Sequence, residues 1–282
     1  MHESPAPLIL THLNFPPRRL LSGTLPPLLL LLHGIGSQEG DLAALVPLLD
    51  DRFHIMSLRA PITLAPSSYA WFEVGLPPRV PQIQTSQAEA SRKLLIEFIR
   101  LAPLHYPIDP QQVHLFGFSQ GAVMSLVLSL TRPDLLAGAV ALSGRILPEL
   151  FSSEGPLAGH IASTQDLKDF PVFLGHGTQD QVLPVHYGRS ARDRLSSLPV
   201  ALTYYEYDMP HLISDACLRD AGTWLSARLH PPSGSKRERG RMECAGRGKV
   251  EGVIRVPLPY DKTTSLSSSP EEDHGSAPEV DR

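Results

Sequence analysis

The chain has 282 residues, of which 42% are hydrophobic and 19% are charged. That apolar content is sufficient for a large core and excludes a wholly disordered chain. A formal net charge of -4 gives no overall electrostatic reason to bind nucleic acid or an anionic membrane, so the composition favours a small neutral substrate.

Short apolar runs alternate with longer amphipathic stretches, as parallel βαβ units require. Strands are predicted over residues 28–32, 53–58, 113–118, 139–142, 172–174 and 202–207. Helices are predicted over residues 41–49, 86–102, 120–131, 187–197 and 214–229. In the second of these helices, Ser86 and Glu89 have capping-box spacing, and Pro103 is expected to end the helix. The order predicts an α/β fold with a doubly wound, mostly parallel sheet, helices on both faces, and ligands beyond the carboxyl ends of the strands.

The composition changes near Ser233, where charged residues, Ser, Gly and Pro replace any sustained apolar periodicity. We expect residues 1–230 to form one domain and residues 231–282 to be a disordered charged tail. The tail is basic in its first half and acidic at its end, which leaves open an arm for nucleic acid or a partner. A solvated tail without function is the favoured interpretation.

The cysteine content and the apolar runs indicate the cellular compartment in which the protein is expected. Only Cys217 and Cys244 occur, and the second lies in the expected tail, so no disulfide framework is predicted. The first ten residues lack a basic region followed by a long apolar stretch, and the run 28–32 is too short to span a bilayer. We therefore expect a soluble, cytoplasmic protein without stable membrane insertion, whose oligomeric state is open.

A Gly-Phe-Ser-Gln-Gly motif at 117–121 stands between a predicted strand and the helix that begins at Gln120. G-x-S-x-G in this context is typical of a nucleophile elbow, which holds the serine in a strained conformation with its hydroxyl in the site. The helix also directs free N–H groups toward the point where a negative oxygen would form. The five letters alone arise by chance in about one chain in ten. Their position therefore supports Ser119 as a nucleophile over a glycine turn that happens to contain a serine.

Two further residues follow in the chain order Ser, Asp, His that α/β-hydrolases use. Asp180 lies in the loop after the strand 172–174, and His211 follows the strand 202–207. The histidine would take the serine proton, and the acid would hold its tautomer. His176 and His186 are the rival bases. Asp208 is the rival acid, but it lies so close to His211 in sequence that it is expected to make a turn.

A glycine-rich turn, HGIGSQEGD, follows the first predicted strand. We expect the backbone N–H groups of Ile35 and Gln120 to form an oxyanion hole, in which losing one donor typically costs about 3 to 4 kcal/mol. The turn has neither the Lys-Ser/Thr end of a phosphate-binding loop nor G-x-G-x-x-G, so no nucleotide cofactor is predicted. His33 is expected to pack against this turn and hold it.

Residues 64–83 are rich in proline and aromatic residues and are expected to form a loop over the site. Within them, Trp71 and Phe72 either line an acyl pocket or fix the loop to the core. Leu183 is the third expected substrate-binding residue. Residues 147–168 are a second possible cover, which the sequence does not identify as a lid.

Several segments resemble the phospholipase/carboxylesterase family of α/β-hydrolases, which includes bacterial carboxylesterases and acyl-protein thioesterases. They are LHGIGSQEGDL, RAP, YAWFEVG, GFSQGA, ALSG and HGTQDQVLP, and the resemblance covers nearly all of residues 25–230. It implies an α/β-hydrolase catalytic domain, a triad of Ser119, Asp180 and His211, and no metal or cofactor. It also agrees with the two oxyanion donors.

The sequence therefore predicts a serine carboxylic ester hydrolase that forms an acyl-enzyme on Ser119, with a small-molecule acyl ester or thioester as its partner and no nucleic acid. An acyl-protein thioesterase would use the same triad. A catalytically silent hydrolase fold used for binding is the alternative from another class. Pro210 stands where the family often has glycine before the catalytic histidine, so the approach of His211 is expected to differ slightly.

Overall fold

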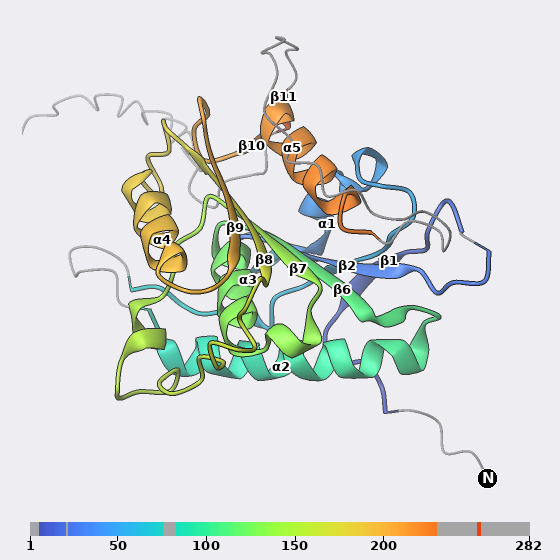
Figure 1. The fold of residues 1–282 in the computed structure, drawn as a ribbon, viewed down its shortest axis with the longest axis horizontal. Coiled ribbons are helices and arrows are strands. Elements are labelled where there is room, and N and C mark those ends of the chain that lie inside the picture. Colours follow the sequence, from blue (N-terminus) through green and yellow to red (C-terminus); the bar gives the residue numbers. More distant parts are fainter. Residues whose placement is uncertain (1–5, 21, 76–82, 230–252, 255–282) are drawn as a thin grey trace, which may run out of the picture.

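The computed structural model describes residues 6–20, 22–75, 83–229 and 253–254 (Figure 1). A seven-stranded sheet of order β1-β3-β2-β6-β7-β8-β9 lies at its centre. It is parallel except for β1, which pairs antiparallel with β3. Its strands are β1 (His12–Phe15), β2 (Pro27–Leu32), β3 (His54–Leu58), β6 (Asp109–Phe118), β7 (Gly138–Leu142), β8 (Pro171–Gly177) and β9 (Ala201–Tyr207). The chain adds strands on one side of β2 and then on the other, so the topological switch point falls between β2 and β6, and the predicted mostly parallel sheet is confirmed.

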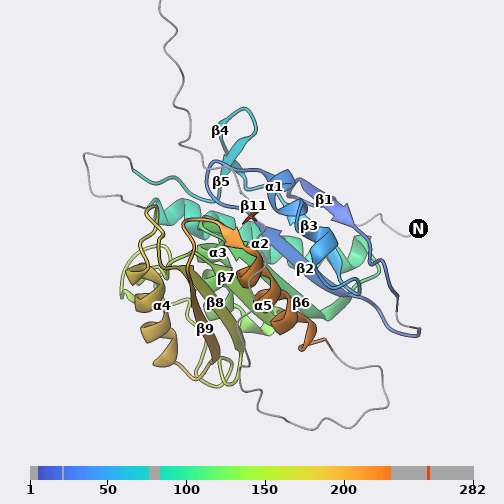
Figure 2. The ribbon, with the colours of Figure 1, turned by 90° about the horizontal axis from the view of Figure 1, so that it is seen from above.

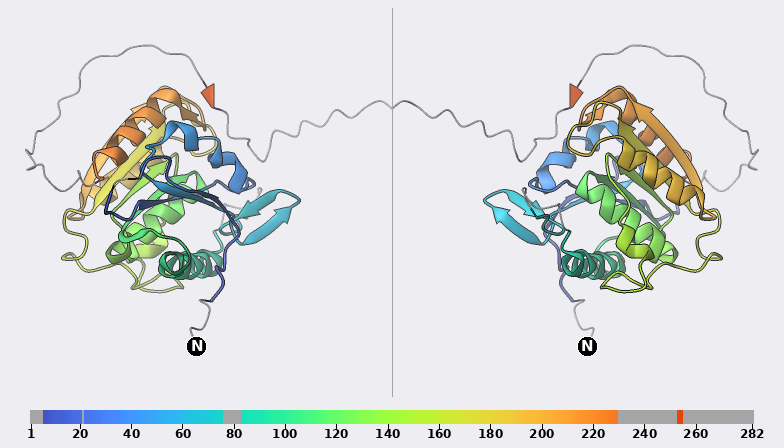
Figure 3. Two further views of the ribbon diagram at one scale, coloured as in Figure 1. Left: turned by 90° about the vertical axis from the view of Figure 1, so that its right-hand side faces the viewer. Right: turned by 90° about the vertical axis from the view of Figure 1, so that its left-hand side faces the viewer.

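Helices cover both faces of the sheet. They are α1 (Glu39–Ala43), α2 (Thr85–His105), α3 (Gln120–Thr131), α4 (His186–Ser196) and α5 (Asp215–Ser226). Figures 1 and 3 show α2 and α3 on one side of the sheet and α5 on the other. The leucines of β2 alternate accordingly: those at 28, 30 and 32 enter the core under α2, α3 and α4, and those at 29 and 31 enter the core under α1 and α5. A fully apolar run therefore indicates a strand that is buried on both faces.

Helix α3 is buried along its whole length, including its three hydroxyl-bearing residues. These hydroxyls donate to carbonyls one turn earlier: Ser125 Oγ to Gly121 O, Ser129 Oγ to Ser125 O, and Thr131 Oγ1 to Val127 O, at 3.0, 2.7 and 2.7 Å. Because each buried hydroxyl donates within the helix, α3 can lie inside the protein without unsatisfied donors.

Two helix predictions need correction. The single helix expected over 41–49 is instead α1 followed by a 3₁₀ turn over Val46–Leu48, because Pro47 lacks the N–H that a continuous α-helix needs. Helix α2 begins after Gln84, so Ser86 and Glu89 form no capping box. It also continues past Pro103 to His105, where Tyr106 N–H closes the last turn on Ala102 O at 3.0 Å.

The region expected to be an irregular loop over 64–83 contains a hairpin. Its strands β4 (Ile62–Ala65) and β5 (Ser68–Ala70) pair antiparallel and project from the body in Figure 2, while residues 76–82 lie outside the described residues. Segment 147–168 is not a separate cover, since its leucines at 147, 150, 157 and 167 are buried in the core under α2, α3 and α4.

Only a small part of the expected tail can be described. Residues 230–252 and 255–282 lie outside the described residues, so the expectation of disorder there stays a prediction. Between them, β11 (Val253–Ile254) pairs antiparallel with β10 (Ile213–Ser214). Among the helices in the described ranges, none has the length and apolar character to cross a membrane.

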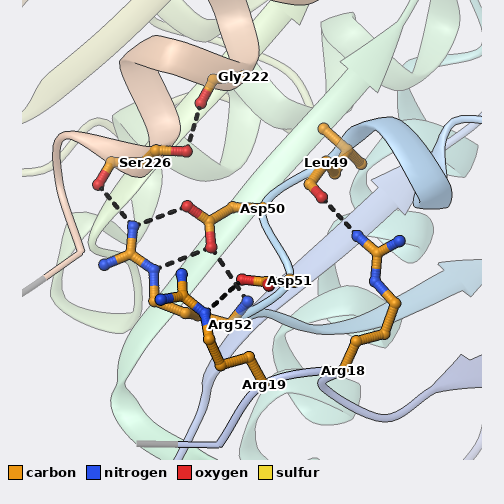
Figure 4. A network of polar contacts seen from close by, with 8 residues as sticks. All are labelled: Arg18, Arg19, Leu49, Asp50, Asp51, Arg52, Gly222 and Ser226. Carbon is orange, nitrogen blue, oxygen red and sulfur yellow. Dashed lines mark hydrogen bonds and ion pairs between the residues drawn. The ribbon is translucent and has the colours of Figure 1, made fainter.

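A network of arginines and aspartates joins the end of α5 to the loop before β3 (Figure 4). Arg52 donates to both carboxylate oxygens of Asp50, at 2.9 and 2.7 Å, and to Ser226 O at 3.3 Å. The hydrogen bonds from Arg52 hold the pKa of Asp50 well below its usual range. Beside it, Arg19 pairs with Asp51 at 2.8 Å.

Candidate active site

Ser119 follows β6 directly and lies at φ 54°, a left-handed conformation that is strained for a residue with a side chain. The turn is possible because two glycines allow close backbone contact. A Cβ on Gly117 would lie 2.3 Å from Gly121 O, and one on Gly121 would lie 1.9 Å from Leu32 O. The elbow therefore requires both glycines of the G-x-S-x-G motif.

A continuous set of hydrogen bonds joins the three residues expected to form the triad. His211 Nε2 lies 2.9 Å from Ser119 Oγ, and His211 Nδ1 lies 2.6 Å from Asp180 Oδ2. Since an ionised carboxylate can only accept, we assign the ring proton to Nδ1, which leaves Nε2 to accept the serine proton. Ser119, Asp180 and His211 are 7%, 4% and 6% exposed, so these contacts are largely shielded from water.

The loop after β8 holds Asp180 through backbone donors. Asp180 Oδ1 accepts from the N–H groups of Val182 and Leu183 at 2.9 and 2.8 Å. The Leu183 carbonyl in turn accepts from His176 Nε2 at 2.7 Å, and burial lowers the pKa of His176. Leu183 thus holds the carboxylate through its backbone N–H, a role that its side-chain type could not reveal, and its expected contact with the substrate stays a prediction.

None of the rival residues takes the place of Asp180 or His211. His176 Nε2 lies 3.6 Å from Asp180 Oδ2, but its hydrogen bond goes to Leu183 O. Asp208 accepts from Gln179 Nε2 at 2.6 Å in an exposed contact, so its carboxylate does not hold His211. His186 is exposed at the start of α4, where its ring stacks on Tyr187 at 4.2 Å between centroids. The structure therefore brings His211, and neither of its rivals, to the serine.

The glycine-rich turn lies against the nucleophile. A Cβ on Gly34 would lie 3.2 Å from Ser119 Cβ, so the turn carries Ile35 close to the elbow. No backbone or side-chain acceptor among the described residues takes the N–H of Ile35 or of Gln120. The two expected oxyanion donors are thus both unengaged and close to Ser119.

His33 holds this turn from inside the protein. Its Nδ1 donates to Gly34 O at 2.7 Å, and its Nε2 accepts from Ala60 N–H at 3.0 Å. Burial lowers the pKa of His33 and so keeps the ring neutral, which the accepting Nε2 requires.

The side chain of Gln120 makes contacts that sequence reasoning missed. Its Oε1 accepts from Trp71 N–H at 2.7 Å, and its Nε2 donates to Phe72 O at 2.6 Å. The Trp71 indole donates to His33 O at 3.0 Å. Trp71 and Phe72 are 0% and 2% exposed, so they fix their segment to the core, which is one of the two roles that the sequence left open.

Comparison with known proteins gives these residues a wider context. The Phospholipase/Carboxylesterase family profile matches residues 24–229. Acyl-protein thioesterase 1 of Kluyveromyces lactis is 36% identical over 113 residues, which are 39% of this chain and 46% of that protein. A probable carboxylesterase, SOBER1-like, of Arabidopsis thaliana is 29% identical over 131 residues, which are 45% of this chain and 47% of that protein. The chain thus spans about half the length of these two curated relatives. The crystal structure of esterase PE8 is similar at a TM-score of 0.65 and 30% identity, over 78% of this chain and 99% of that one.

Proposed function

Because the chain belongs to the phospholipase/carboxylesterase family of α/β-hydrolases, we propose that it is a serine hydrolase that cleaves carboxylic esters through an acyl-enzyme on Ser119. The observation that carries the proposal is the hydrogen-bonded series from Asp180 through His211 to Ser119, at 2.6 and 2.9 Å. A serine hydroxyl is a weak nucleophile at neutral pH, and this series is the arrangement that activates it.

In the first half of the reaction, Ser119 Oγ attacks the ester carbonyl while His211 Nε2 takes its proton. Asp180 keeps the Nδ1–H tautomer and stabilises the imidazolium that forms. The carbonyl oxygen becomes an oxyanion, which the N–H groups of Ile35 and Gln120 stabilise. The tetrahedral intermediate then expels the alcohol, which leaves with the proton from His211 Nε2.

The second half reverses these roles with water as the nucleophile. His211 Nε2 takes a proton from water, whose oxygen attacks the acyl carbon of the ester on Ser119. The same two N–H groups stabilise the second oxyanion. Collapse releases the carboxylic acid and returns the proton to Ser119 Oγ, so the protein groups alone complete the cycle.

A fluorophosphonate probe tests the nucleophile. We expect one covalent adduct on Ser119 by peptide mass spectrometry, and we expect Ser119→Ala to lose both labelling and hydrolysis of p-nitrophenyl acetate. Ser143 is an internal control, because it too is buried and has a positive φ, 49°. An adduct on Ser143, or full activity in Ser119→Ala, would contradict the proposal.

A second candidate is hydrolysis of acyl thioesters by the same triad. The similarity to a protein named acyl-protein thioesterase supports it. Esters and thioesters of the same acyl chains, from two to sixteen carbons, separate the candidates: the preferred bond is the one with the higher kcat/KM at matched chain length.

We further propose that the enzyme acts in the cytoplasm. A chain with only two cysteines, and therefore no disulfide framework, suits a reducing compartment. Cell fractionation with an antibody against the chain tests this, and recovery in a secreted fraction would contradict it.

A further inference from the structure

A cavity of about 150 Å³ lies between helix α4 and the segment that follows β7. Arg145 and Phe151 line it from the segment, and Tyr187, Ser190 and Arg194 line it from the helix. The three helical residues are spaced at i, i+3 and i+7, so they share one face of α4. None of these residues takes part in the proposed ester chemistry.

The cavity carries two arginines whose charges are not neutralised. Among the ion pairs of the described residues, none involves Arg145 or Arg194. Glu149 lies in the same 3₁₀ turn as Phe151, but it does not line the cavity and pairs with neither arginine. A cavity lined by two cations and no acid favours an anion.

Both guanidinium groups are held over aromatic rings. Arg145 lies 5.6 Å from the centroid of the Tyr187 ring, and Arg194 lies 4.4 Å from that of Phe151. Stacking restrains the planar group while its N–H edge stays able to donate, a geometry that suits the paired oxygens of a carboxylate or phosphate. The hydroxyls of Tyr187 and Ser190 are further donors on the same cavity wall.

The two segments that line the cavity also contact the proposed site. A Cβ on Gly144 would be 3.3 Å from Ser119 O, which places the Cα of the next residue, Arg145, within roughly 9 Å of that oxygen. On the other wall, α4 packs against the residues that hold Asp180, since a Cβ on Gly188 would lie 2.6 Å from His176 Nδ1. Both walls of the cavity therefore belong to segments that pack beside the elbow or beside the loop that holds Asp180.

We propose that this cavity binds a carboxylate or phosphate group carried by the substrate, so that the enzyme selects acyl esters with a negative charge beyond the scissile bond. The inference rests on the proposed function, because it names the substrate class of the same site. The anion binds to Arg145 and Arg194 and is not consumed in the reaction.

Direct binding tests the site without catalysis. Calorimetric titration of the full chain carrying Ser119→Ala with inorganic phosphate, and separately with acetate, is expected to show one site. Arg145→Gln or Arg194→Gln in the same background should weaken binding at least about tenfold, as loss of a charge-assisted hydrogen bond implies. Arg219→Gln is the matched control, because Arg219 is exposed on α5 and does not line the cavity. Equal affinity in all four proteins, or absence of binding, would overturn the proposal.

Kinetics test whether the anion belongs to the substrate. We compare p-nitrophenyl butyrate and hexanoate with the mono-p-nitrophenyl esters of succinic and adipic acid, which have the same chain lengths and a terminal carboxylate. Arg145→Gln and Arg194→Gln should each raise KM for the carboxylated esters at least tenfold and change KM for the neutral esters less than twofold. If phosphate binding needs both arginines while these KM values do not change, the cavity holds a free anion, and the substrate part of the proposal is wrong. If the fluorophosphonate fails to label Ser119 while phosphate binding depends on the arginines, the ester chemistry fails and the anion site stands.

Discussion

The side chain of Gln120 offers the sharpest test of how the site is built. Gln120→Leu keeps a side chain of similar size and keeps the backbone N–H, but it removes the acceptor for Trp71 N–H and the donor to Phe72 O. Both backbone groups belong to residues that are 0% and 2% exposed, so water cannot replace the lost partner without opening the segment.

The expected loss of stability follows from the two orphaned groups. A buried donor or acceptor without a partner costs about 1 to 3 kcal/mol, so two cost about 2 to 6 kcal/mol. That is a large fraction of the 5 to 15 kcal/mol that typically separates folded and unfolded domains. Activity should fall as well, by on the order of 10-fold to 100-fold in kcat, because small displacements of an oxyanion donor are costly.

Gln87→Leu is the matched control for Gln120→Leu. Gln87 also binds this segment through its side-chain amide, accepting from Glu73 N–H at 2.7 Å and donating to the carboxylate oxygen Glu73 Oε2 at 3.1 Å, but both contacts are exposed. Urea denaturation followed by circular dichroism should show a loss of less than about 1 kcal/mol for this control, since water can replace exposed partners. If the two variants lose equal stability, the reasoning from burial is wrong.

Three further outcomes are expected. Asp180→Asn should lower kcat for p-nitrophenyl acetate by on the order of 10⁴-fold, because the histidine then adopts the wrong tautomer; a loss below tenfold would rule out the assigned role. Gly188→Ala should lower the unfolding free energy by about 1 to 3 kcal/mol, since its Cβ would lie 2.6 Å from His176 Nδ1, whereas Gly222→Ala, with no atom within 4 Å, should raise it by about 0.4 to 1 kcal/mol in the same urea assay. Burial lowers the pKa of His33, so below its ordinary value of 6.5 the unfolded chain binds a proton that the folded chain does not. As the pH is lowered below about 6.5, the unfolding free energy should therefore decrease, and this residue should contribute up to roughly 1.4 kcal/mol per pH unit. In His33→Asn the unfolding free energy should depend less steeply on pH.

The central strands could be predicted because their sequences identify them without knowledge of any partner. Five consecutive leucines at 28–32 can be buried only where both faces of a strand are covered, and all five are 0% exposed. The edge strand β1 was missed for the opposite reason. It is short and partly exposed, and among the residues that the structure describes it pairs only with β3. No local pattern reports a pairing with a segment so far along the chain.

In the candidate site, too, some features could be predicted from the sequence and others could not. The chain order of Ser119, Asp180 and His211 follows from the loops after three predicted strands, and parallel strands place those loops at one edge of the sheet. The contacts between Gln120 and the Trp71 segment could not be predicted, because they depend on which segment folds over the elbow. The same is true of the cavity, whose arginines come from a loop and a helix that meet only in the folded chain.

The proposed chemistry and the proposed substrate selection rest on different kinds of contact. The ends of β2, β6, β8 and β9 meet backbone to backbone: a Cβ on Gly121 would lie 1.9 Å from Leu32 O, and one on Gly177 would lie 2.3 Å from Met209 O. Such contacts allow no side chain, so changes there disturb folding and the triad together. The arginine cavity is instead lined by side chains on α4 and the segment after β7. Its charge can therefore change while Ser119, Asp180 and His211 keep their geometry, which is why the arginine variants should alter KM for charged esters and leave neutral esters unaffected.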